Sequence, residues 1–216
     1  MSRIICKCFF FFLIHNFSFA QTCKELNDQV EKQYLDGQLE EAEATAIRAL
    51  KVCKEESSTP SEYATSLNNM AFFNQSKGDM EKAKEQFNEA LSIYQKARGG
   101  YDPEHATTLI NIGDLYRTMG DTKTAIDYLK DAMKMIAEGE GKETMYADAT
   151  SALANIYYDM GEYENARVLF AEIVEINKKL LGDKDPGYAN CLGNLAMAYS
   201  GLGNYQEALT LYLKGL

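Results

Sequence analysis

The sequence predicts an all-α fold, a right-handed superhelical solenoid of antiparallel helix pairs. The first observation is a period: a glycine followed five residues later by an alanine recurs with 41, 42, 41 and 42 residues between successive glycines. The five pairs are Gly37/Ala42, Gly78/Ala83, Gly120/Ala125, Gly161/Ala166 and Gly203/Ala208. The second observation is that apolar residues on both sides of these glycines follow helical spacing. Self-similarity at a fixed period of this length indicates a repeat array.

Each period is expected to hold two helices with the glycine between them. In the fourth period, the apolar stripe of the first helix consists of Ala149, Leu153, Ala154, Ile156 and Tyr157, and that of the second consists of Tyr163, Ala166, Phe170, Ile173 and Val174. Gly161 suits the left-handed conformation that ends a helix. Ala166 is small because two antiparallel helices cross there at close range. The matching small residues of the first helices are Ala71, Gly113, Ala154 and Ala196.

The repeat array is expected to cover residues 21–216. Its repeats are predicted at about 22–56, 63–98, 105–138, 146–181 and 188–216. The first has Gln29 and Gln33 where the others carry large apolar residues, which suits a terminal repeat with one face in water. The fifth is truncated at Leu216, before its second helix reaches the length of the earlier ones. We therefore expect a fragment, or a further repeat or domain beyond Leu216.

Residues 1–20 depart from the repeat pattern and resemble a secretory signal peptide. A basic start at Arg3 precedes a mostly apolar stretch from Ile4 to Ala20, and Ser18 and Ala20 form a small-x-small cleavage signature. The alternative is an uncleaved anchor, but spanning a bilayer takes about 20 apolar residues. We expect cleavage after Ala20, export to a periplasmic or extracellular location, and no stable membrane span in the mature chain.

Charge and composition exclude several classes of function. The formal net charge is −10, and an acidic chain repels phosphate backbones, so nucleic-acid binding is not expected. His105 is the single histidine after Ala20, and the carboxylate and nucleophile partners that it would need as a general base are missing. We expect no catalytic residues, no metal site, no cofactor and no enzyme activity.

Three segments carry a resemblance to a known family. They are residues 63–71 (YATSLNNMA), 105–113 (HATTLINIG) and 187–196 (GYANCLGNLA), and the last two follow Pro-containing loops at 101–103 and 182–186. The pattern resembles the tetratricopeptide repeat (TPR), in the version of about 42 residues seen in kinesin light chain. The resemblance covers about residues 22–216, and it implies a concave groove that binds a protein or an extended peptide.

The predicted groove surface comes from the first helix of each repeat, because these helices line the concave side of such a solenoid. The candidate residues are Asn68, Asn69, Phe72, Asn111, Asp114, Arg117, Ser151, Asn155, Tyr158, Asn190, Asn194 and Met197. Asn69, Asn111 and Asn194 share one register. The resemblance implies that an amide there contacts a peptide backbone; the alternative is that these asparagines bond to neighbouring helices.

Cys23 and Cys53 are candidates for a disulfide. Cys23 lies 14 residues before Gly37 and Cys53 lies 16 after it, so both are expected at the open end of the first helical hairpin. An exported protein permits a disulfide there. The alternative is two unrelated thiols.

The leading hypothesis for function is a non-enzymatic, exported scaffold that binds a protein or peptide in the concave groove. The alternative is the N-terminal sensing or recruiting region of a larger exported protein, with a caspase-like protease or a signalling domain beyond residue 216. A third hypothesis, that the array is itself a hydrolase, has only His105 to support it.

Overall fold

The computed structural model describes residues 21–55, 58–96, 102–137, 139 and 143–216. Within these ranges the chain forms ten α-helices and no strand, which confirms the all-α prediction. The helices are α1 (Cys23–Leu35), α2 (Leu39–Glu55), α3 (Pro60–Ser76), α4 (Met80–Lys96), α5 (Pro103–Thr118), α6 (Thr122–Ala137), α7 (Glu143–Asp159), α8 (Tyr163–Leu181), α9 (Pro186–Gly201) and α10 (Tyr205–Lys214). The predicted signal peptide, residues 1–20, lies outside the described residues.

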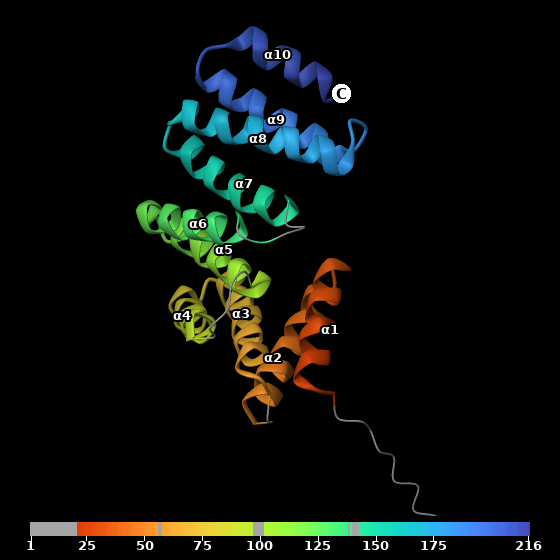
Figure 1. The fold of residues 1–216 in the computed structure, drawn as a ribbon, viewed down its shortest axis with the longest axis vertical. Coiled ribbons are helices and arrows are strands. Elements are labelled where there is room, and N and C mark those ends of the chain that lie inside the picture. The colour runs from red at the N-terminus through yellow and green to blue at the C-terminus, as the bar shows by residue number, and fades with distance from the viewer. Residues whose placement is uncertain (1–20, 56–57, 97–101, 138, 140–142) are drawn as a thin grey trace, which may run out of the picture.

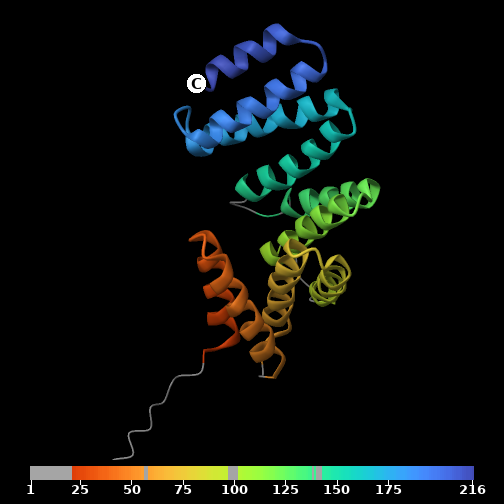
Figure 2. The same ribbon diagram turned by 180° about the vertical axis from the view of Figure 1, so that it is seen from behind.

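Consecutive helices pair antiparallel and stack into the predicted right-handed solenoid. Figure 1 shows the array from α1 and α2 at one end to α9 and α10 at the other, and Figure 2 shows the same order from behind. The first helices α1, α3, α5 and α7 contact one another in turn, while α2, α4, α6 and α8 each pack between their own partner and the next repeat. The core is accordingly divided into local clusters between neighbouring helices.

The five periodic glycines make the turns inside the hairpins. Each has a positive φ, between 75° and 82° for Gly37, Gly120, Gly161 and Gly203 and 85° for Gly78. At Gly37, the glycine N–H donates to the Tyr34 carbonyl and the next N–H donates to the Gln33 carbonyl. This pair of bonds defines a Schellman motif, and it satisfies carbonyls that a helix end leaves unpaired.

The small residues lie where the helices of a hairpin cross, as predicted. Ala42, Ala83, Ala125 and Ala166 are fully buried, and Ala208 is almost so. Gly113 shows how close the helices approach, because a Cβ at that position would lie 2.8 Å from Leu129 Cγ.

The first helices of later repeats begin two or three residues before the predicted repeat starts. Pro60, Pro103 and Pro186 occupy the first turn of α3, α5 and α9. Proline is favoured there because the backbone N–H that it lacks would have no hydrogen-bond partner in the first turn of a helix. Thr59 and Asp102 then cap α3 and α5 by accepting backbone hydrogen bonds. The predicted repeat ends at 56, 98 and 138 lie outside the described residues.

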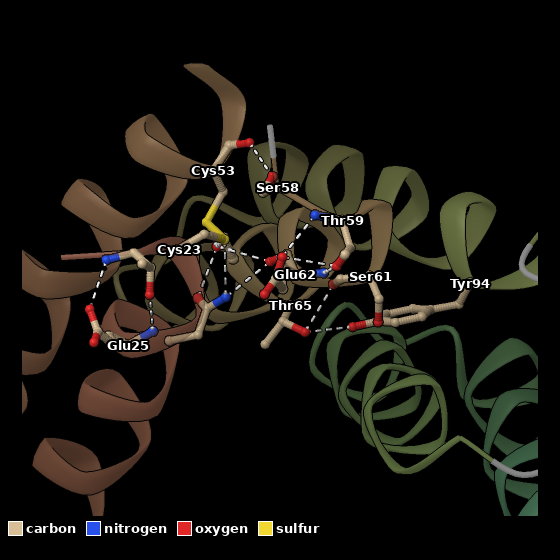
Figure 3. The surroundings of a disulfide bond; sticks show 12 residues. Cys23, Glu25, Cys53, Ser58, Thr59, Ser61, Glu62, Thr65 and Tyr94 are labelled. Atoms are coloured by element: carbon tan, nitrogen blue, oxygen red, sulfur yellow. Dashed lines mark hydrogen bonds between the residues drawn. A yellow bond between two sulfur atoms is a disulfide. The ribbon is translucent and has the colours of Figure 1, made fainter. Parts of the chain in front are cut away.

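The first hairpin carries the predicted Cys23–Cys53 disulfide (Figure 3). The two Cα atoms are 4.9 Å apart, and both cysteines are buried. The bond joins the start of α1 to the end of α2. Because α1 has few large apolar side chains of its own, this covalent bond compensates for a weak hydrophobic contact.

Two observations concern the surface of the array. Across the described ranges, no helix is long and apolar enough to cross a membrane. The last helix, α10, exposes several apolar side chains, among them Leu209, Tyr212 and Leu213.

Candidate functional site

The concave side of the array holds a groove of about 460 Å³ between α1, α3 and α5. Its lining residues are Asn27, Asp28, Val30, Glu31, Tyr34, Thr65, Asn68, Asn69, Phe72, Phe73, Tyr94, Pro103, Glu104, Thr107, Asn111 and Met145. We call this space the N-terminal groove. Most of its lining comes from first helices, and Tyr94 of α4 and Met145 of α7 complete it.

Helical spacing explains why these side chains face one space. On α3, Thr65, Asn68, Asn69 and Phe72 are three, four and seven residues apart, so they share one face of the helix. The same spacing on α1 brings Asn27, Glu31 and Tyr34 into line, and on α5 it brings Glu104, Thr107 and Asn111 into line. The groove surface therefore consists mainly of three stripes of side chains, one from each of the packed helices α1, α3 and α5.

A buried polar network fixes α1 against α3 beneath the groove. The Ser66 hydroxyl donates to Asn27 Oδ1 at 2.8 Å, and Asn27 Nδ2 donates to the Glu62 carbonyl at 3.0 Å. Ser66 Oγ also lies 2.8 Å from Cys53 Sγ. Figure 3 shows the surroundings of the disulfide, with Glu62 among the labelled residues. With the disulfide, this network ties α1 to both α2 and α3, so the α1 wall of the groove is held in place.

Aromatic rings form the apolar part of the lining. Tyr34 meets Phe72 edge to face, with ring centroids 5.2 Å apart, and Phe72 meets Phe73 in the same way at 5.6 Å. The Tyr94 hydroxyl lies 2.9 Å from Thr65 Oγ1. Burial raises the pKa of Tyr94 to about 12, so its hydroxyl stays protonated. Tyr94 thus contributes a neutral hydroxyl to the aromatic part of the lining.

Asparagine amides form the polar part of the lining. Asn111 Nδ2 on α5 donates to Asn68 Oδ1 on α3 at 3.2 Å. Asn68 is only 8% exposed, whereas Asn69 and Asn111 are half-buried. For Asn111 the structure therefore shows a bond to the neighbouring helix, and the same residue also lines the groove.

Four of the twelve predicted groove residues line the N-terminal groove: Asn68, Asn69, Phe72 and Asn111. The other eight lie further along the array or make other contacts. Arg117 Nη2 pairs with Asp114 Oδ1 at 2.7 Å, and Asp114 also accepts from Gln75. Tyr158 packs edge to face on Tyr163. Ser151 and Asn155 lie on α7, and Asn190, Asn194 and Met197 lie on α9.

Sequence reasoning missed the contribution of α1. Asp28, Glu31 and Tyr34 line the groove but were not among the candidates, because the first repeat was interpreted as a cap. Their position in the repeat could have identified them, because Glu31 and Tyr34 belong to the first helix of their repeat, like the candidates in α3 and α5. Glu104, in the first turn of α5, was missed in the same way.

The charge in the groove is negative. Asp28, Glu31 and Glu104 line it, and none of the lining residues is Lys, Arg or His. Burial raises the pKa of the Glu104 carboxyl, and the nearby carboxylates of Asp102 and Glu31 add to this effect. Lys24 pairs with Asp28 at 2.6 Å. In the described part of the chain, Glu31 and Glu104 have no such cationic partner.

His105 is packed as part of the core. This residue is buried, and its ring stacks on Tyr94 with centroids 5.6 Å apart. Burial lowers its pKa, and its Nε2 has no hydrogen-bond partner among the described residues. Over the described ranges, no group of three or more His, Cys, Asp or Glu residues is arranged to hold a metal ion.

The chain has stacked helical hairpins, Schellman turns at a fixed period and a concave groove. These features define the class of helical repeat solenoids, whose concave faces are extended binding surfaces. A family model for the tetratricopeptide repeat matches residues 62–138 and 146–216. The chain belongs to the tetratricopeptide repeat family, whose fold is typical of protein-binding, generally non-catalytic scaffolds.

Relatives narrow the comparison to the kinesin-light-chain-like version of the repeat. The chain is 26% identical over 136 residues to "Protein KINESIN LIGHT CHAIN-RELATED 1" of Arabidopsis thaliana, covering 62% of this chain and 22% of that protein. It is 30% identical over 140 residues to a TPR repeat-containing protein of Dictyostelium discoideum, covering 61% of this chain and 8% of that one. The matched part is thus less than a quarter of these relatives' length.

Among solved structures, BtubC (BKLC) from P. vanneervenii superposes with a TM-score of 0.75 at 20% identity. The match covers 89% of this chain and 77% of BtubC. At this identity the likeness shows the shared solenoid fold.

Proposed function

We propose that this chain is a binding scaffold that holds an extended peptide segment of a partner protein in the N-terminal groove. The observation that carries the proposal is the groove itself, which is lined by amides and aromatic rings from three helices. An asparagine amide can donate to and accept from a peptide backbone at once. Aromatic rings supply apolar contact area for side chains of the peptide.

Six of the remaining predicted residues lie on α7 and α9. Asn155 and Met197 are exposed, and Asn194 is half-buried. We propose that they contact the partner beyond the segment held in the N-terminal groove. The chain's net charge of −10 supports a protein partner over nucleic acid, because nucleic-acid binding relies on Lys and Arg contacts to phosphate.

A peptide selection tests the proposal. A random twelve-residue library is selected against the purified chain, and each binder is retested against two variants. Thr107→Tyr fills the groove with a neutral ring, because Thr107 lines it. Asn88→Tyr places the same ring on the exposed surface of α4 as a control. We expect binding to be lost with Thr107→Tyr and kept with Asn88→Tyr; equal binding by both variants would contradict the groove as the site.

We also propose that the chain is exported and cleaved after Ala20. The Cys23–Cys53 disulfide supports this, because disulfides persist in oxidising compartments and are rare in the cytosol. N-terminal sequencing of the protein recovered from its native source is the test. A mature chain beginning at Gln21 is expected, and an intact Met1 would refute cleavage.

The second candidate function is recruitment within a larger exported protein that has a caspase-like protease or signalling domain beyond residue 216. The exposed apolar side chains of α10, including Leu209 and Leu213, support a packed neighbour on that face. Reading the gene beyond the codon for Leu216 tests this candidate directly. A stop codon there would remove it and leave the groove proposal intact.

A further inference from the structure

We propose that the N-terminal groove selects a cationic side chain, Lys or Arg, in its peptide ligand, which it seats between Glu31 of α1 and Glu104 of α5. This inference rests on the proposed function and adds the chemistry of the ligand. Two observations lead to it: the charge of the lining and the character of its walls.

The charge of the lining is negative and only partly compensated. Glu31 and Glu104 come from helices on opposite sides of α3, and both line the groove. In the described part of the chain, Lys24 pairs with Asp28 and its ammonium group also senses the charge of Glu104, but neither Glu31 nor Glu104 forms an ion pair with a Lys or Arg. No Lys, Arg or His lines the groove, so the field inside it favours a positively charged group.

The two carboxylates also destabilise each other. The negative charge of Glu31 contributes to raising the pKa of Glu104, and burial contributes more. Both side chains are solvent-exposed, so water weakens this repulsion but leaves its sign unchanged. A cation placed between the two carboxylates reduces the repulsion, which favours its binding.

The walls suit the rest of a long cationic side chain. Tyr34 lies one helical turn from Glu31 on α1, and its ring packs edge to face on Phe72. Lys and Arg carry an aliphatic stem that packs on apolar surface while the charged group remains solvated or paired. An aromatic wall next to carboxylates therefore matches both parts of the side chain.

The experiment uses the peptides selected from the random library. Those whose binding is lost in Thr107→Tyr are groove binders, and we expect a Lys or Arg at one fixed position in them. Each is resynthesised with Gln or Glu at that position, and affinity for the full chain is measured by fluorescence anisotropy. We expect Gln to weaken binding about tenfold and Glu to weaken it further, since charge pairs at interfaces carry specificity.

Matched variants of the protein locate the effect. Glu31→Gln combined with Glu104→Gln should weaken the Lys or Arg peptide about tenfold and leave the Gln peptide unchanged. Glu81→Gln combined with Glu85→Gln removes the same charge from the exposed surface of α4 and should change neither affinity. Circular dichroism melting confirms that each variant is folded.

The outcomes separate the two proposals. Groove binders that are uncharged or acidic, or a Lys preference that survives Glu31→Gln with Glu104→Gln, would overturn the cationic ligand and leave peptide binding in the groove standing. Selection that gives no groove binders would overturn the proposed function, and this inference with it.

Discussion

Alanine substituted for glycine should change stability in opposite directions at Gly113 and Gly193. Both glycines lie inside helices, α5 and α9, so the gain in helix propensity is the same, about 1 kcal/mol. Their surroundings differ. A Cβ at Gly113 would lie 2.8 Å from Leu129 Cγ and 3.0 Å from Leu129 Cδ2, whereas a Cβ at Gly193 meets nothing within 4 Å.

The magnitude follows from whether Leu129 can move. Leu129 is fully buried, and the close atom is its branching carbon rather than a flexible end. Overpacking of this kind costs about 1–3 kcal/mol. Gly113→Ala should therefore lose about 1 kcal/mol of stability after the propensity gain is subtracted, and Gly193→Ala should gain about 1 kcal/mol.

Urea unfolding followed by circular dichroism measures both changes. With a slope of about 2 kcal/mol per molar urea, the two midpoints should lie about 1 M apart, on either side of the parent chain. The slope should be equal in all three proteins, which checks that the unfolding reaction is the same. If Gly113→Ala raised the midpoint as much as Gly193→Ala, the argument for a close helix crossing at Gly113 would be wrong.

Three further predictions concern the first repeat and its neighbour. Changing both Cys23 and Cys53 to serine should destabilise the first hairpin by about 3 kcal/mol. Compared with the parent chain, hydrogen exchange should become faster in α1 and should change less in α9. Ser66→Ala leaves Asn27 Oδ1 without its donor and should cost about 1–2 kcal/mol by urea unfolding. Burial lowers the pKa of His105, so the unfolded chain binds more protons. Stability should fall as pH drops through the ordinary histidine value of about 6.5. His105→Gln should flatten that dependence in melting curves.

The fold could be predicted because its strongest constraints are local in sequence. The turn requires glycine at Gly37 and Gly161, where φ is positive. The close helix crossing requires a small residue at Ala42 and Ala166, which are fully buried. Both requirements recur once in every repeat. The disulfide could be predicted for the same reason, since the turn at Gly37 fixes which residues lie opposite one another.

The groove was only partly predictable because it depends on how successive hairpins are placed. Helical spacing put Asn68 and Phe72 on the inner face of α3, and both line the groove. A bond from Asn111 to a neighbouring helix was one of two alternatives, and the sequence could not name Asn68 as the partner, since that contact depends on the distance between α3 and α5. Nor did it show that Glu104 would sense the charge of Glu31, two repeats away.

The first repeat connects stability to binding in this chain. A terminal hairpin has a neighbour on one side only, and its first helix, α1, buries few large side chains. The Cys23–Cys53 disulfide and the hydrogen bonds among Asn27, Ser66 and Glu62 hold that helix against α3. Because α1 also supplies Glu31 and one wall of the groove, the bonds that stabilise the end of the array also fix the geometry of its ligand site. Loosening α1 should therefore weaken binding at this groove while leaving the packing of α7 to α10 intact.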